Sequence, residues 1–207
     1  MLYAHADIAG DVVLVTGATS GIGEACAWRF AEAGCKLVLT GRRSQRLDSL
    51  KASIEAKYEG VEVTCVTMDV TDLERVAALP GALLPLEVDI LVNNAGLALG
   101  VAPAEANSMA HMQQMMATNV TALMAMSAAF LPGMKARGKG HLINIGSIAG
   151  HEAYAGTWRR GSGPGPDPDP GCCLPPAACP LPLTHLPQPH LDSPPPPTDP
   201  QLTSPSH

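Results

Sequence analysis

The chain has no surplus of positive charge and no long apolar run. Its 207 residues include 13 Lys and Arg against 19 Asp and Glu, which gives a net charge of −6 and a calculated pI of about 5.6. This balance argues against a general nucleic-acid-binding surface. No stretch approaches the roughly 20 apolar residues of a membrane helix, and the N-terminal MLYAHADIAGD lacks the basic and apolar regions of a signal peptide. We therefore expect a cytoplasmic protein with neither nucleic acid nor membrane as a partner.

The last 51 residues lack Val, Ile, Phe, Met and Lys altogether, and they hold 16 of the 20 prolines. The scattered Leu residues that remain are too few for strands or an aliphatic core. The composition therefore predicts a folded domain over residues 1–156, followed by a disordered, Pro-rich tail over residues 157–207.

The tail also contains two patterns that are associated with binding. Four prolines at 194–197 favour polyproline II, which SH3 and WW domains bind, although no Arg or Lys lies near them. The tail also contains five candidate metal ligands, which are Cys172, Cys173, Cys179, His185 and His190. Their spacing fits no standard zinc pattern, so we predict no metal site. The remaining cysteines lie in or beside apolar runs and are predicted to be buried thiols of a cytosolic protein: Cys26, Cys35 and Cys65.

Short apolar runs alternate with helix-length segments up to residue 145. Strands are predicted at 12–16, 36–40, 61–68, 88–92 and 141–145. Helices are predicted at 22–33, 44–58, 71–79 and 106–137. Gly34 should end the first helix, Thr71 should cap the third, and the long fourth helix should break near Pro132 and Gly133. The alternation predicts an α/β fold with a doubly wound parallel sheet, incomplete after its fifth strand.

The first predicted strand is followed by a glycine-rich turn, Thr16-Gly17-Ala18-Thr19-Ser20-Gly21-Ile22-Gly23. Its three glycines let the backbone turn tightly and approach a pyrophosphate, while the helix behind them offers free N–H groups and the positive end of its dipole. The turn lies between a strand and a helix, which is the context that dinucleotide binding requires. The alternative is a purely structural turn. The candidate cofactor contacts here are Gly17, Thr19, Ser20, Gly21, Ile22 and Gly23.

The second predicted strand ends without the acidic residue that usually holds the adenosine ribose of NAD(H). Arg42 and Arg43 follow it instead. Guanidinium groups suit a 2′-phosphate, so this end favours NADP(H). The alternative is that both arginines are solvated charges at the start of a helix.

Two further motifs follow the third and fourth predicted strands. Asp69 and Val70 end the third strand, where a carboxylate can accept a hydrogen bond from an adenine amino group, although such an Asp is also common at a helix start. The sequence NNAG ends the fourth strand and supplies the candidate contacts Asn93, Ala95 and Gly96. All these residues lie at the carboxyl ends of strands, where open α/β sheets bind ligands.

Together these motifs resemble, in order and spacing, the classical short-chain dehydrogenase/reductase family. The resemblance rests on TGATSGIG, Asp69-Val70, NNAG, Asn119-Val120 and Ile145-Gly146-Ser147, and covers about residues 8–156. HLINIGSIAG followed by AYAG is similar to the NADP-dependent enzymes that oxidise 3-hydroxy acids such as serine or allo-threonine.

The resemblance implies a Rossmann-like NADP-binding domain and a hydride transfer between nicotinamide and a hydroxy or carbonyl substrate. In the family a Tyr is the general acid/base, a Lys four residues later lowers the pKa of that Tyr, a Ser bonds the substrate oxygen and an Asn supports a proton-relay water. Ser147 matches the Ser and Asn119 matches the Asn. The alternative for Asn119 is a satisfied structural amide on a largely apolar helix. The family pairs through its long helix and the helix that carries the Tyr, so the resemblance implies a homo-oligomer. Because only the long helix is found in this chain, we expect the subunit contact to be weakened.

The chain departs from the family pattern after Ser147. The position of the Tyr is occupied by Arg160 and that of the Lys by Pro164, while Tyr154 lies only seven residues after Ser147 and cannot substitute. We therefore expect little or no dehydrogenase activity. The abrupt change suggests a frame change or a retained intron, which sequencing of the transcript would test. Two alternatives remain open: a catalytically silent NADP(H)-binding module, and a Pro-rich interaction protein on an α/β scaffold.

Overall fold

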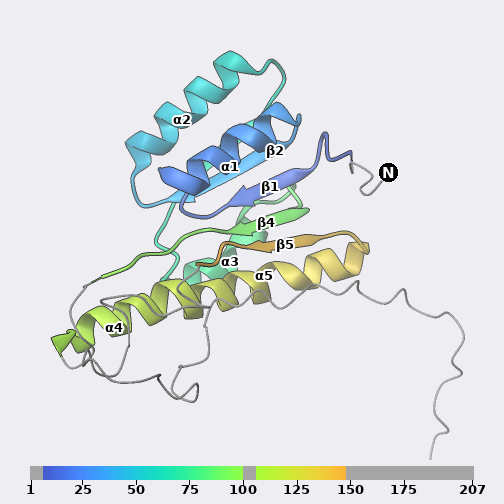
Figure 1. Cartoon of the computed structure of the whole chain (residues 1–207). Coiled ribbons are helices and arrows are strands. Elements are labelled where there is room, and N and C mark those ends of the chain that lie inside the picture. Colours follow the sequence, from blue (N-terminus) through green and yellow to red (C-terminus); the bar gives the residue numbers. More distant parts are fainter. Residues whose placement is uncertain (1–6, 100–105, 148–207) are drawn as a thin grey trace, which may run out of the picture.

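The computed structural model describes residues 7–99 and 106–147, which form a parallel sheet with helices on both faces (Figure 1). The sheet has five strands in the order β3-β2-β1-β4-β5, all paired in parallel. These are β1 (Val12–Val15), β2 (Lys36–Gly41), β3 (Val63–Thr67), β4 (Ile90–Asn93) and β5 (His141–Asn144). The predicted doubly wound, Rossmann-like sheet is confirmed. The tail predicted for 157–207 lies outside the described residues.

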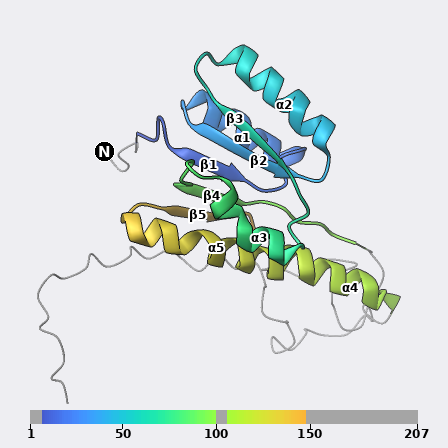
Figure 2. The same cartoon turned by 180° about the vertical axis from the view of Figure 1, so that it is seen from behind.

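Two helical layers cover the sheet, one on each face (Figures 1 and 2). One layer contains α1 (Gly21–Glu32) and α2 (Ser44–Lys57). The other contains α3 (Leu73–Ala82) and a long helix made of α4 (Met109–Met116), the π-helical segment η2 (Ala117–Thr121) and α5 (Ala122–Arg137).

Alternation within the strands divides the core between these layers. In β1, Val13 and Val15 join the cluster under α1 and α2, whereas Val12 and Leu14 join the cluster under α3 and α5. All four side chains are at most 8% exposed. Strands that are buried on both faces favour a continuous apolar run, which explains VVLV in β1 and the first three residues of β4, ILV.

The strand order reverses at β1, and this reversal determines where a ligand can bind. From β1 the chain proceeds outward to β2 and β3, then crosses back to β4 on the other side of β1. The connections that leave the carboxyl ends of β1 and β4 therefore diverge to opposite faces of the sheet. The crevice between them is the usual ligand site of open α/β sheets.

The predicted end of the first helix is confirmed, but the predicted cap of the third is wrong. Gly34 has φ +78°, its N–H bonds the Ala31 carbonyl, and the Cys35 N–H bonds the Phe30 carbonyl at 3.0 Å, as in a Schellman motif. Helix α3 is capped by Asp72, which accepts from the Arg75 N–H at 3.1 Å. Thr71 lies one residue before this cap, and its hydroxyl donates to Asp69 Oδ1 at 2.8 Å.

The expected break near Pro132 and Gly133 is also wrong, because both residues lie inside α5. Pro132 and Ala128 are exposed, so the Ala128 carbonyl that loses its helical partner faces water. The irregularity lies instead in η2, around Asn119. By length and hydropathy alone, the continuous helix Met109–Arg137 could cross a membrane. A single such helix is weak evidence, and Met126, Phe130 and Met134 of this one lie in the core.

The cysteine prediction is correct for one residue of the three. Cys35 is buried, and burial, helped by the nearby charge of Asp11, raises the pKa of its thiol to about 11. Cys26 and Cys65 are only half-buried, and burial raises the pKa of both thiols. All three are free thiols with little thiolate at neutral pH, which makes them poor nucleophiles.

Candidate functional site

A cleft of about 520 Å³ lies at the carboxyl ends of the strands, where the strand order reverses. Its size is within the range of small-molecule and cofactor sites. It brings together most of the predicted contact residues and several that were not predicted. The lining residues are Gly17, Thr19, Ser20, Ile22, Gly41, Arg42, Arg43, Met68, Asp69, Val70, Asn94, Ala95, Gly96, Leu97 and Thr118.

The glycine-rich turn forms one wall of this cleft. Gly17 and Gly21 have φ values of +66° and +59°, which L side chains rarely adopt. Ser20 precedes α1 without a side-chain cap hydrogen bond. The first N–H groups of α1 have no acceptor within the helix, so they and the helix dipole favour an anion here.

Gly21 and Gly23 do not line the cleft themselves, and Gly23 has a packing role. A Cβ atom on Gly23 would lie 2.5 Å from the Gly17 carbonyl oxygen, and it would also meet the Asn94 amide. Gly23 therefore lets α1 start directly against the turn. Gly21 has open space around its missing Cβ, so its role is to adopt the positive φ that the turn requires.

Arg43 reaches across from the end of β2 to the glycine-rich turn. Its Nη2 donates to Thr19 Oγ1 at 2.6 Å and to Ser20 Oγ at 2.9 Å. Gly41 allows this contact, because a Cβ atom on it would lie 2.7 Å from Thr19 Cγ2. The guanidinium group of Arg43 therefore holds positive charge beside the first turn of α1.

Arg42 lies beside Asp69 at the same end of the cleft. Its Nη1 is 3.6 Å from Asp69 Oδ2, and the two side chains are 67% and 42% exposed. The pKa of Asp69 is lowered first by the hydrogen bond that the Thr71 N–H donates, then by the Thr71 hydroxyl and by Arg42, against an opposing effect of burial. An exposed ion pair at this distance is weak, so Arg42 is available to a stronger anion.

The loop after β4 is held against the end of β1 by Thr16, whose role was not predicted. Thr16 Oγ1 accepts from the N–H groups of Asn94 and Ala95, both at 2.9 Å. The Asn94 amide donates in turn to the carbonyls of Thr16 and Gly17, at 2.9 and 3.2 Å. The residues of this contact belong to the TG and NNAG motifs of the sequence. That the two motifs bond each other follows only from the parallel register of β1 and β4.

Asn93, the last residue of β4, was predicted to contact the cofactor but does not line the cleft. Its side chain is 4% exposed and points into the protein. Nδ2 donates to Asn144 Oδ1 on β5 at 3.0 Å and to Ser127 Oγ on α5 at 3.1 Å. Its role in cofactor binding stays a prediction, while its visible role is to join β4 to β5 and α5.

Asn119 contacts the far end of the same loop from η2. Its Oδ1 accepts from the Leu97 N–H at 2.9 Å, and its Nδ2 donates to the Leu97 carbonyl at 2.8 Å. Both polar groups of the amide thus bond backbone atoms, and the catalytic role of Asn119 stays a prediction. Ser147 is exposed and follows β5 by three residues. Tyr154, Arg160 and Pro164 lie outside the described residues.

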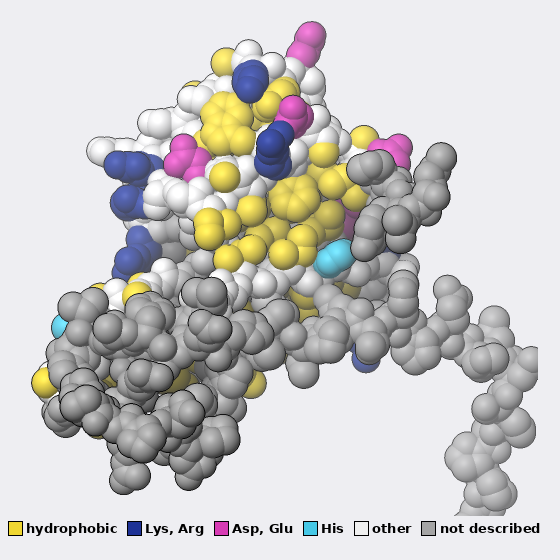
Figure 3. Space-filling model, viewed as in Figure 1, with side chains coloured by type: hydrophobic (Ala, Val, Ile, Leu, Met, Phe, Trp, Pro, Cys, Tyr) yellow, Lys and Arg dark blue, Asp and Glu magenta, His cyan; other side chains and the backbone are white. Residues whose placement is uncertain are grey.

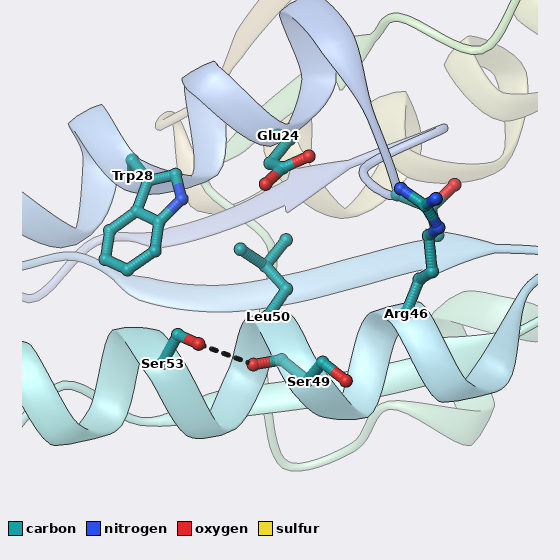
Figure 4. A pocket seen from close by; sticks show the side chains of 7 residues that line it. Glu24, Trp28, Arg46, Ser49, Leu50 and Ser53 are labelled. Carbon is teal, nitrogen blue, oxygen red and sulfur yellow. Dashed lines mark hydrogen bonds between the residues drawn. The ribbon is translucent and has the colours of Figure 1, made fainter.

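A second hollow, of about 320 Å³, lies between α1 and α2 (Figure 4). Glu24 and Trp28 of α1 face Arg46 and Leu50 of α2 there. The two serines that line it are committed to their own helix, since Ser49 and Ser53 donate to the carbonyls of Gln45 and Ser49. Thr19 is the only predicted contact residue in its lining, so the first cleft is the better candidate.

The sequence matches known proteins over the region that builds this cleft. A family sequence model described as short chain dehydrogenase matches residues 11–159. This chain belongs to the short-chain dehydrogenase family. The matched region ends one residue before Arg160, and it includes the predicted domain boundary at residue 156.

Two relatives of this chain are named as dehydrogenases of a 3-hydroxy acid and of serine. An NADP-dependent 3-hydroxy acid dehydrogenase, YdfG, of Salmonella typhi is 46% identical over 149 residues, which are 70% of this chain and 57% of the relative. A serine 3-dehydrogenase of Agrobacterium fabrum is 42% identical over 144 residues, 70% of this chain and 56% of the relative. The chain therefore spans less than three fifths of the length of these curated relatives.

Solved structures show the same likeness. Serine dehydrogenase from Escherichia coli has a TM-score of 0.64 and 44% identity, over 70% of this chain and 66% of that one. The closed form of a serine dehydrogenase complexed with NADP⁺ has a TM-score of 0.65 and 44% identity, over 70% of this chain and 57% of that one.

Proposed function

We propose that this chain binds NADP(H) in the cleft at the carboxyl ends of its strands. The observation that carries the proposal is the pair Arg42 and Arg43 on the cleft wall, at the strand end where NAD(H) sites hold an acidic residue. Relatives named as NADP-dependent and a neighbour complexed with NADP⁺ support the same cofactor. The three free thiols fit a reducing compartment such as the cytoplasm.

The residues present fit the cofactor from one end of the cleft to the other. The open first turn of α1, with Ser20 and Ile22, suits the pyrophosphate. Arg42 and Arg43 suit the 2′-phosphate, and Asp69 suits the adenine amino group. Gly96 and the loop that Asn119 bonds at Leu97 would contact the nicotinamide half of the cofactor. When bound, the cofactor supplies the hydride donor or acceptor.

We propose further that hydride transfer to or from a hydroxy or carbonyl substrate is weak or absent. Ser147 can bond a substrate oxygen. Arg160 cannot act as the general acid/base, because its guanidinium group stays protonated at all physiological pH values. Pro164 has no amine with which to lower a pKa or to hold a ribose. The chain is therefore proposed to be an NADP(H)-binding member of a dehydrogenase family that is at most weakly active.

Replacing Arg42 with Ala should weaken NADPH binding about 10–100-fold, because hydrogen bonds to charged groups contribute about 1.5–3 kcal/mol. NADH affinity should change little, because NADH has no 2′-phosphate for Arg42 to meet. Fluorescence titration of the purified chain with each nucleotide measures both affinities.

Lys51→Ala, on the exposed side of α2, is the charge-matched control for this titration. Equal weakening of NADPH and NADH binding in Arg42→Ala would show that Arg42 does not read the 2′-phosphate. Failure of the unmodified chain to bind NADPH would favour the reading as a Pro-rich interaction protein.

We also propose that a second copy of the chain covers the outer face of the long helix. Met109, Met116, Met124 and Leu131 are 65%, 53%, 64% and 36% exposed and recur every seven or eight residues along it. No Asp, Glu, Lys or Arg lies between Met109 and Leu131. A single uncharged stripe of this kind can pair with itself about a two-fold axis.

The double substitution Met116→Glu with Met124→Glu should convert a dimer to a monomer, because it places like charges at the centre of the paired stripe. Light scattering coupled to size exclusion measures the mass. Leu84→Glu, at a residue that is 67% exposed and follows α3, outside the stripe, should leave the dimer intact. A monomeric unmodified chain at micromolar concentration would refute the pairing.

A further inference from the structure

The side-chain amide of Asn93 is buried, and only its nitrogen is used. Nδ2 donates to Asn144 Oδ1 and to Ser127 Oγ. The Ser127 hydroxyl donates its own proton to the Leu123 carbonyl at 2.9 Å, so Ser127 Oγ can only accept from Asn93. This determines the orientation of the amide. Asn93 Oδ1 consequently has no hydrogen-bond donor among the described residues.

Asn93 lines a small recess directly behind the wall of the cleft. The recess has a volume of about 10 Å³, and it shares Val70, Ala95 and Thr118 with the cleft. Of its two other polar side chains, Thr16 is already committed, since Thr16 Oγ1 accepts from the N–H groups of Asn94 and Ala95 and donates to the Val92 carbonyl. Asn93 Oδ1 and the Thr118 hydroxyl are therefore the side-chain groups left to hold a ligand.

We propose that the recess binds one ordered water molecule, which donates to Asn93 Oδ1 and bonds the Thr118 hydroxyl. The volume is about that of one water-sized probe and too small for a larger ligand. Buried polar atoms are nearly always hydrogen-bonded, and internal waters commonly satisfy those that the chain itself leaves without a partner.

The proposed water joins two elements that no direct side-chain bond joins at this point. Asn93 ends β4, whereas Thr118 lies in η2 next to Asn119, which holds the loop at Leu97. The water therefore braces the π-helical turn against the sheet and helps to position the wall of the cleft. This role depends on the fold and not on which cofactor the cleft binds.

Water-to-amide nuclear Overhauser effects in the full-length, isotope-labelled chain test the proposal. We expect the unmodified protein and the variant Thr118→Ser, which keeps the hydroxyl, to show a long-lived water next to the backbone amide protons of positions 95 and 118. Thr118→Val, which exchanges the hydroxyl for a methyl group of similar size, should weaken those signals several-fold.

The absence of such signals in the unmodified protein would overturn the proposal, as would full retention of them in Thr118→Val. Should Thr118→Val fail to fold, the unmodified protein and Thr118→Ser still decide the question, since both must show the water. Electron density for a water within hydrogen-bond distance of Asn93 Oδ1 in a crystal of the unmodified chain would support the same conclusion.

Discussion

The purified chain should bind NADPH and yet transfer hydride at least about 10²–10⁴-fold more slowly than a serine dehydrogenase relative, because a positioned general acid/base contributes about that factor. The cleft, the glycine-rich turn and both arginines are in place for binding. From the resemblance to the family, the positions expected for the catalytic Tyr and Lys hold Arg160 and Pro164. Binding and turnover should therefore separate in this protein.

The absorbance of reduced nicotinamide measures turnover with 3-hydroxy acids such as serine and with short aldehydes and ketones. A serine 3-dehydrogenase serves as the positive control under the same conditions. Clear NADPH-dependent turnover by the chain, abolished by Ser147→Ala, would show that another group donates the proton. Turnover that survives Ser147→Ala would instead indicate a contaminating enzyme.

Replacing Gly23 with Ala should destabilise the fold by about 1–3 kcal/mol and weaken NADPH binding at least about tenfold, because overpacking a close contact displaces backbone. The new Cβ would lie 2.5 Å from the Gly17 carbonyl oxygen, which is main chain and cannot rotate away. The Asn94 amide on its other side already bonds Thr16 and Gly17. Relief therefore requires α1 to move away from the turn that it helps to form.

Gly81→Ala is the matched control, since Gly81 is also helical but has no atom within 4 Å of its missing Cβ. It should be neutral or slightly stabilising, because Ala loses less conformational entropy than Gly in a helix. Urea denaturation and NADPH titration of both variants measure the two effects. Wild-type stability and affinity in Gly23→Ala would show that α1 can shift without cost.

An apolar surface between α1 and β5 bears on how the chain behaves in solution (Figure 3). Half-buried Cys26 and Phe30 of α1 and Ile143 and Ile145 in and after β5 pack at the rim of the core under α1. Within the described residues β5 pairs only with β4, so its other edge has no strand beside it. Such an edge favours association, and the assays above therefore need a check of oligomeric state.

Local patterns predicted the elements well where one local interaction dominates. VVLV and the LVL of KLVLT lie in strands because a strand buried on both faces favours consecutive apolar side chains. Gly34 ends α1 because only a residue that tolerates positive φ can close that turn. The Thr71 prediction failed because Asp72, one residue later, accepts the capping hydrogen bond, and the Pro132 prediction failed because Pro132 lies on the exposed side of a continuous helix.

Linear order and residue type determined the parallel sheet, the family and the set of candidate cofactor contacts, since these depend on period, spacing and chemical group. Tertiary structure decided which residues of that set line the cleft and which pack in the core. Asn93 and Asn94 are neighbours of one type, yet successive residues of an extended chain point to opposite sides. Asn93 therefore turns into the core toward Asn144 and Ser127, while Asn94 lies at the cleft. Which amide meets which partner depends on strands distant in sequence, and only the folded chain brings them together.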